Sequence, residues 1–75
     1  MIKYKMDILA ELDSCGWTHK RIKAGKILSE ATIHSLRHGG MISLASLNNI
    51  CLMLRCQPGE LLEEVPEDAE KIRFF

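Results

Sequence analysis

Residues 18–39 read THKRIKAGKILSEATIHSLRHG, and this stretch holds two short helical patterns joined by a turn. Thr18 is a favourable N-cap, because a threonine hydroxyl can accept a hydrogen bond from a free amide of the first turn. We therefore predict a first helix over residues 19–24, which is mostly cationic and has Ile22 as its apolar anchor. Gly25 weakens this helix and marks its end.

Ser29 is the clearest helix start in the chain, because its hydroxyl can accept a hydrogen bond from a first-turn amide and the next residue is acidic. The helix that follows is predicted to extend to His38. Its apolar positions, Ile33 and Leu36, form one narrow stripe for the core. Gly39 ends the helix, as a glycine in the left-handed conformation would. The outward side carries Glu30, Ala31, Thr32, Ser35 and Arg37.

Amphipathic patterns on either side of this stretch predict further helices. Before it, an apolar face ends at Gly16, and its members are Met6, Ile8, Leu9 and Leu12. After it, Ser43 caps a helix whose core stripe consists of Leu44, Leu47, Ile50, Cys51 and Leu54. Pro58 suits the first position of a last short helix, because the amide that proline lacks has no helical partner there. Pro66 then separates the helical region from a tail.

The two ends of the chain have a different pattern. Residues 2–5 alternate between apolar and polar side chains with the period of a strand. The tail, residues 66–75, begins acidic and ends in two phenylalanines, which are an unusual exposure for a soluble protein. Two hypotheses follow. Either both ends are strands, which pair with each other or across a dimer, or both ends are disordered.

Length and composition favour one small domain. The chain has 75 residues, of which 47% are hydrophobic and 5% aromatic, so its core must be built from side chains that suit packed helices. We predict an all-α fold, a compact bundle of about five short helices, with short terminal strands as an option. Residues 1–65 would form the domain and residues 66–75 the tail. No apolar run is long enough to cross a bilayer and no signal-peptide pattern is present, so a cytoplasmic protein is expected.

The cysteines and histidines do not form a recognisable metal motif. Cys15, Cys51 and Cys56 are odd in number and lack a CxxC pair, and the three histidines lie in a different segment. We interpret Cys51 and Cys56 as small apolar core residues in a reducing compartment, and Cys15 as a partly exposed thiol. We predict no metal site and no cofactor.

Charge is distributed unevenly along the chain, although the formal net charge is zero. Residues 17–40 hold five Lys and Arg against one Glu, a net charge of +4. Residues 41–75 hold three Lys and Arg against six Asp and Glu, a net charge of −3. A basic segment of this kind is what phosphate contacts require, because each neutralised phosphate releases counterions. The plainer interpretation is a solvated face of a helix pair.

Residues 18–39 resemble the helix-turn-helix of the Cro and phage-repressor-like (XRE) family of regulators. Within them, residues 29–39 are similar to the family's recognition helix and its glycine stop. Residues 42–51 look like the family's fourth helix, and residues 56–62 look like its closing helix. The likeness covers roughly residues 6–65 and implies a lambda-repressor-like DNA-binding domain.

Two positions depart from the family's pattern. Lys23 stands where the family often has a small residue, and Ile27 stands where the turn often has glycine. The aliphatic stem of Lys23 can lie along the helix pair while its charge reaches water. The turn of residues 25–28 can be rearranged to accommodate the larger Ile27.

The resemblance implies a sequence-specific transcriptional regulator, a repressor that binds double-stranded DNA as a homodimer. Its recognition helix would be residues 29–38, placed in the major groove. The residues implied to contact base edges are Glu30, Ala31, Thr32 and Ser35. The residues implied to contact phosphates are His19, Lys20, Lys26 and Arg37. Recognition would be thin, because no Asn, Gln or Arg lies in the first two turns of this helix.

Other interpretations remain open for the same residues. Glu30 can be a partner of the helix dipole only, Thr32 and Ser35 can be exposed polar residues, and His34 and His38 can be surface residues. The alternative function is a protein-interaction or antitoxin-like accessory module with weak or no DNA binding. We expect no enzyme, because no Ser-His-Asp, Cys-His or paired-carboxylate set shares a predicted pocket. No membrane partner or small-molecule substrate is expected.

Overall fold

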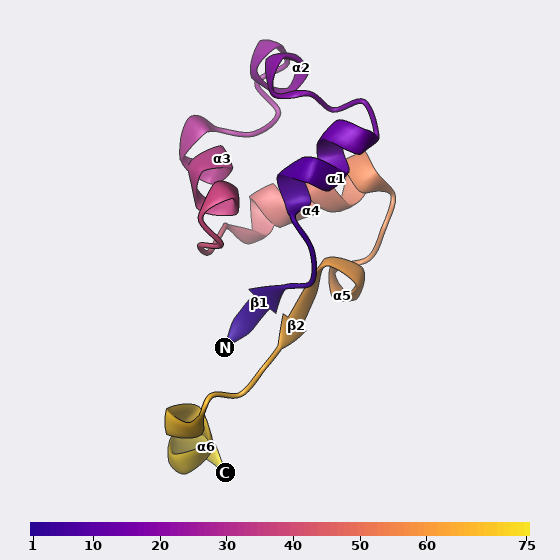
Figure 1. The fold of residues 1–75 in the computed structure, drawn as a ribbon. Coiled ribbons are helices and arrows are strands. Elements are labelled where there is room, and N and C mark those ends of the chain that lie inside the picture. Colours follow the sequence, from indigo (N-terminus) through magenta and orange to yellow (C-terminus); the bar gives the residue numbers. More distant parts are fainter.

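The computed structural model describes all 75 residues and shows a helical body with a small sheet. The elements are β1 (Ile2–Tyr4), α1 (Ile8–Ser14), α2 (His19–Ala24), α3 (Glu30–Arg37), α4 (Leu44–Leu54), α5 (Pro58–Leu61), β2 (Leu62–Glu64) and α6 (Asp68–Phe74). Helices α1 to α4 surround one core, the strands lie below it, and α6 projects beyond them (Figure 1). The mainly helical fold confirms the predicted fold class. No helix has both the length and the apolar character that crossing a membrane requires.

Each of the first four helices begins at a residue whose side chain satisfies a first-turn amide. The cap oxygen accepts from the amide three residues later, at 3.1 Å for Asp7, 3.2 Å for Thr18 and 3.1 Å for Ser29. Ser43 accepts from the amide of Ser46 at 3.1 Å in the same way. The predicted caps Thr18, Ser29 and Ser43 are therefore confirmed, and each contributes about 1 kcal/mol to helix stability.

Helix α3 ends where the sequence predicted. Gly39 has φ +70°, a left-handed conformation that glycine adopts without a steric penalty. Its amide donates to the carbonyl of Leu36 at 3.4 Å, and the amide of Gly40 donates to the carbonyl of Ser35 at 2.7 Å. This pair of bonds is a Schellman motif, which satisfies two carbonyls at the helix end. The chain consequently turns sharply towards α4.

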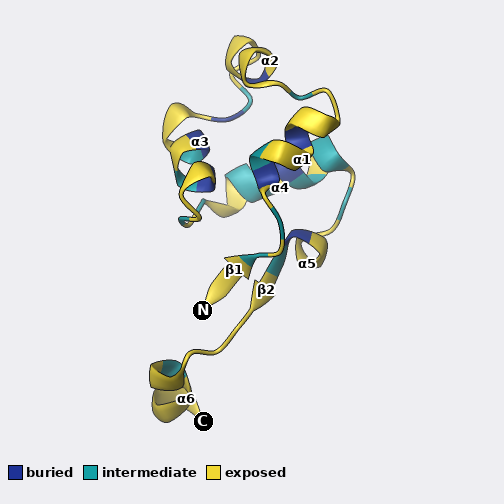
Figure 2. Ribbon diagram, in the orientation of Figure 1, coloured by how far each residue is buried: buried dark blue, intermediate teal, exposed yellow.

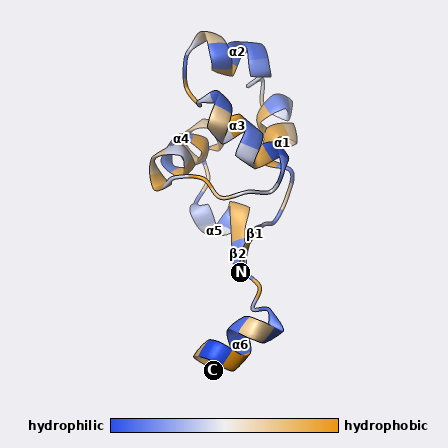
Figure 3. Ribbon diagram, turned by 90° about the vertical axis from the view of Figure 1, so that its left-hand side faces the viewer, coloured by the Kyte–Doolittle hydropathy of each residue, from blue (hydrophilic) through white to orange (hydrophobic).

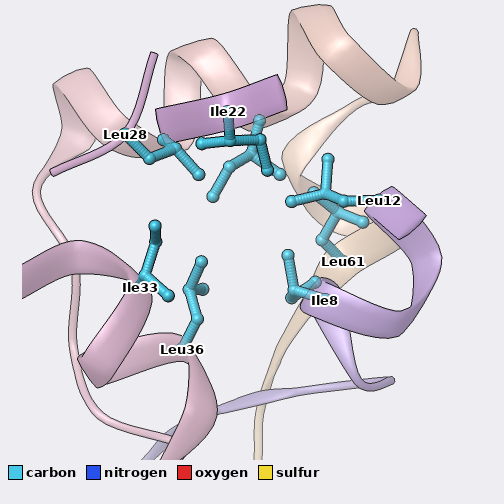
Figure 4. Close-up of a cluster of buried hydrophobic side chains, with 8 residues drawn as sticks. Ile8, Leu12, Ile22, Leu28, Ile33, Leu36 and Leu61 are labelled. Carbon is cyan, nitrogen blue, oxygen red and sulfur yellow. The ribbon is translucent and has the colours of Figure 1, made fainter. Parts of the chain in front are cut away.

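Eight buried aliphatic side chains form the core, and they converge from the helices α1 to α5 and from the turn between α2 and α3 (Figure 4). They are Ile8, Leu12, Ile22, Leu28, Ile33, Leu36, Ile50 and Leu61. Ile22, Ile33 and Leu36 point inward, as predicted. Leu28 was missed by the sequence analysis. It directly precedes the cap Ser29, and an apolar residue at that position commonly packs against the fourth helical residue, here Ile33.

The predicted core stripe of α4 is wrong at one position, Leu44. The sequence pattern placed it in the core, but its side chain is 82% exposed. The reason is its position in the first turn, at the edge of the body, where no other helix covers it. There it lines a groove between β1 and the loop that follows α3. Leu47, Cys51 and Leu54 pack against the core as predicted, around the fully buried Ile50.

The N-terminal strand is confirmed, whereas a strand in the tail is wrong. β1 pairs antiparallel with β2, in the register Ile2 with Glu64 and Tyr4 with Leu62. The partner strand therefore lies before residues 66–75. The tail forms α6 instead, because its residues favour helix and the carboxylate of Glu70 accepts from the amide of Glu67 at 3.0 Å, which stabilises the first turn.

Tyr4 connects the sheet to the end of α3. Its hydroxyl donates to the carbonyl of Gly40 at 2.6 Å, and burial raises the pKa of Tyr4 above its usual value. The amide of Lys5 donates to the carbonyl of Leu61 at 2.9 Å, which continues the pairing beyond β1. The loop after α3 is thereby held against the strands.

Replacing Tyr4 with Phe removes the hydroxyl and leaves the ring, so it tests this connection alone. We expect the free energy of unfolding to fall by about 0.5–1.5 kcal/mol, the usual contribution of one hydrogen bond. Urea denaturation followed by circular dichroism measures this change. A denaturation midpoint equal to that of the unchanged protein would show that the bond to Gly40 adds nothing to stability.

Candidate nucleic-acid interface

The start of α3 lies beside the start of α2. The Oε1 atom of Glu30 is 3.6 Å from Nε2 of His19 and 3.7 Å from Nζ of Lys23. All three side chains are more than half exposed, so these contacts orient the groups without adding much stability. The structure thus brings together His19 and Glu30, which the sequence analysis assigned to phosphate and base contacts. The Lys23 side chain is exposed, so its charge reaches water as predicted.

The exposed side of α3 differs in part from the predicted one, because Glu30 and Arg37 are exposed as predicted but Thr32 is half-buried. Ala31 is exposed, as predicted, and Ser35 is half-buried. His34 and His38 are both exposed, and their rings lie 4.4 Å apart between centroids. The two histidines were not among the predicted base contacts. The helical period could have suggested them, because around the helix His38 lies as far from Ile33 and Leu36 as Ala31 does, and His34 as far as Ser35.

The hydroxyl of Thr32 is directed towards α4. It accepts from Ser29 Oγ at 3.0 Å and lies 3.2 Å from Ser46 Oγ. Ser43 Oγ in turn donates to Ser46 Oγ at 3.0 Å. Four hydroxyls therefore form a chain that links the N-terminal turns of α3 and α4. This chain fixes the position of one helix start relative to the other, and it leaves only the methyl group of Thr32 for other contacts.

The cations of the basic segment do not all share one environment. Lys20 and Lys26 are exposed, as phosphate contacts require. Arg37 and His19 line the same hollow of about 120 Å³, which also contains Asp13 and lies between α1, α2 and α3. Arg21 instead stacks over the ring of Trp17 at 3.9 Å and donates to the carbonyl of Gly16 at 3.2 Å. It contributes to the α1–α2 connection.

The turn between α2 and α3 uses a lysine in the left-handed conformation. Lys26 has φ +51°, whereas Gly25 has φ −85° and is right-handed. The structure thus has its left-handed position at Lys26, one residue before Ile27. Ile27 is half-buried against the core, which explains why a large side chain is tolerated there.

The potential metal ligands of the chain, including its cysteines, are dispersed. No group of three or more His, Cys, Asp and Glu side chains is arranged to hold a metal ion. The three cysteines are free, Cys15 exposed and Cys51 and Cys56 half-buried. Burial raises the pKa of the Cys56 thiol, with smaller effects from Cys51 and Glu60, which is the behaviour of an unreactive packing residue.

Two consecutive helices joined by a tight turn, with the second exposing one side on a small helical core, define a helix-turn-helix domain. The family model of the Cro/C1-type HTH DNA-binding domain matches residues 4–67 of the 75-residue chain. The chain belongs to this family, and the resemblance found in the sequence is confirmed. No curated protein and no solved structure gives a significant match.

Replacing Lys26 with Asn tests the cost of the left-handed turn. Asn adopts this conformation more readily than lysine, so the free energy of unfolding should rise by up to about 1 kcal/mol. The matched control is Lys23→Asn within α2, where the same change should lower stability by roughly 0.5 kcal/mol because asparagine favours helix less. Urea denaturation of both variants measures the rise and the fall in the free energy of unfolding. A loss of stability in Lys26→Asn would show that the left-handed conformation of Lys26 carries no such cost.

Proposed function

We propose that this protein is a sequence-specific DNA-binding transcriptional regulator that represses by occluding DNA. One observation carries the proposal: α2 and α3 are held together over the core while one side of α3 stays exposed. An α-helix fits the major groove, and in helix-turn-helix proteins its first turns meet base edges. We propose α3 as the recognition helix of a homodimer that acts in the cytoplasm.

The proposed base contacts lie along the exposed side of α3. Glu30 can accept from a cytosine amino group once it exchanges its weak pairs with His19 and Lys23, and Ala31 can meet a thymine methyl. Ser35 can bond either type of base, and Thr32 can offer its methyl. To these we add His34 and His38, which are exposed on the same helix and can donate or accept hydrogen bonds.

The proposed phosphate contacts lie on α2, on the turn and at the end of α3. They are His19, Lys20, Lys26 and Arg37, all exposed. The contact of His19 with Glu30 marks where the start of α2 lies next to that of α3, and this arrangement would let the two helices address one stretch of DNA backbone and groove. These contacts would position the protein and make its affinity depend on salt.

Single changes of Lys20 and Arg37 to Ala test the phosphate contacts. Each should reduce the slope of log affinity against log salt by about 0.9, the value for one lost phosphate contact on duplex DNA. Titration of a fluorescent duplex, selected from genomic fragments that the purified protein retains, at several salt concentrations measures the slope. Lys71→Ala on α6 is the matched control, and its slope should equal that of the unchanged protein.

An unchanged slope in both Lys20→Ala and Arg37→Ala would contradict the proposed placement of DNA. Absence of binding to any duplex would overturn the proposed function and favour the protein-interaction module.

Two changes at Thr32 separate its methyl group from its hydroxyl. Thr32→Ser keeps the hydroxyl chain and removes the methyl, so it should weaken preference for thymine by on the order of 1 kcal/mol with little change in stability. Thr32→Val keeps a methyl and breaks the chain, so unfolding should become easier by about 1 kcal/mol. Duplex competition and urea denaturation measure these effects. A Thr32→Ser protein with unaltered sequence preference would exclude base contact by this residue.

A further inference from the structure

Helix α6 carries large apolar side chains that are mostly exposed, although the Arg73 guanidinium lies over the ring of Phe74 at 5.2 Å. Ile72 is 85% exposed, Phe74 is 73% exposed and Phe75 is 87% exposed. Ile72 and Phe75 are three residues apart and share one side of the helix, and Phe74 flanks Phe75. No residue of α6 is buried, and the whole element projects from the body (Figure 2). A helix of this composition is costly to leave in water.

The body of the same chain contains a groove that is equally apolar. It has a volume of about 320 Å³ and lies between β1 and the loop from α3 to α4. Its apolar walls include Ile2, Met41, Ile42, Leu44 and Leu62. Met41 is 86% exposed. Lys3 is the only lining residue with a charged side chain, so the groove suits an apolar ligand and not a nucleic acid.

The helix of one chain is held away from the groove of that chain. The N-terminal ammonium group of Met1 donates to the carbonyl of Val65 at 2.9 Å and to the carboxylate of Glu70 at 2.5 Å. It also contacts the carboxylate of Glu64. These contacts fix the start of α6 beyond the ends of the strands, as both Figure 1 and the hydropathy view in Figure 3 show. The apolar residues of α6 therefore face solvent.

We propose that the groove of one copy receives α6 of a second copy, in a reciprocal homodimer. The occupant is a second copy because each chain carries both complementary parts, the exposed Ile and Phe side chains at the end of α6 and an apolar groove, and buries neither within itself. Exchange of the two contacts about a two-fold axis satisfies both copies at once and closes the assembly. This inference rests on the homodimer of the proposed function and assigns the surfaces that form it.

The area available is sufficient for a stable dimer. If each of the three apolar side chains of α6 buries about 150 Å², with a matching area on the exposed wall residues Ile2, Met41 and Leu44, one contact buries roughly 900 Å². Two contacts then bury about 1,800 Å², within the range of specific protein interfaces. The groove is also next to Gly39 and Gly40, so a docked partner would lie at the end of α3 and fix the distance between the two recognition helices.

Sedimentation of the intact chain and of two variants tests the exchange. The first variant, Ile72→Ser with Phe75→Ser, removes the apolar side of α6. The second, Met41→Ser with Leu44→Ser, makes the groove polar. All four side chains are exposed, so neither variant should unfold. We expect the intact chain to be dimeric and each variant to have a dissociation constant at least tenfold higher. Leu52→Ser, on an exposed part of α4 outside the groove, is the matched control and should remain dimeric.

Mixing the two variants gives the sharper result. In a mixed dimer the intact helix of one variant meets the intact groove of the other, so an equimolar mixture should regain dimer that neither variant forms alone. An intact chain that is monomeric at 100 times the concentration used for DNA titration would overturn the proposal, as would a mixture no more dimeric than its parts. Dimer exchange without DNA binding would support this contact and overturn only the proposed function. DNA binding by a strictly monomeric chain would overturn this contact and the proposed homodimer, and would support only the proposed DNA binding.

Discussion

The burial of Ile22 is the constraint on which the α2–α3 unit depends. Helix α2 has six residues and three cationic side chains, and Ile22 is its only buried residue. At 1% exposure it packs in the core with Leu28 and Ile33, which flank the cap of α3 on either side. A short, charged helix has little stability of its own, so its position relative to α3 follows from this apolar contact. The exposed pairs around Glu30 only refine it.

Helix α3 is fixed at both ends by polar contacts that do not use its exposed side. At its start, the hydroxyls of Ser29 and Thr32 continue into those of Ser46 and Ser43 on α4. At its end, the Gly39 turn and the bond from Tyr4 to Gly40 hold the loop. The helix is therefore held in place without its exposed side chains, which remain free for a ligand. This separation of support from contact is what a recognition element requires.

The sequence could predict the helix starts and the Gly39 stop because these depend on neighbouring residues. A Ser or Thr cap and a left-handed glycine act within one turn of chain. Leu28 and Leu44 were misjudged because their burial depends on distant elements, namely whether another helix covers them. The tail was misjudged for the same reason, since the partner of β1 is β2 and not residues 66–75. In the candidate site, the contact of Thr32 with Ser46 also joins positions 14 residues apart.

The exposed side of α3 explains why a second copy matters to the proposed function. Some of its side chains are short or are not free to contact a base. The side chain of Ala31 is a single methyl group and Ser35 is half-buried. The Thr32 hydroxyl is directed to α4. One copy thus offers few strong base contacts, since the good bidentate donors are absent from these turns. Two copies held at a fixed distance read two half-sites, and their contact energies combine in one binding event. Helix α6 lies outside residues 4–67, which the family model matches, so in the proposed dimer it would set that distance from outside the matched domain.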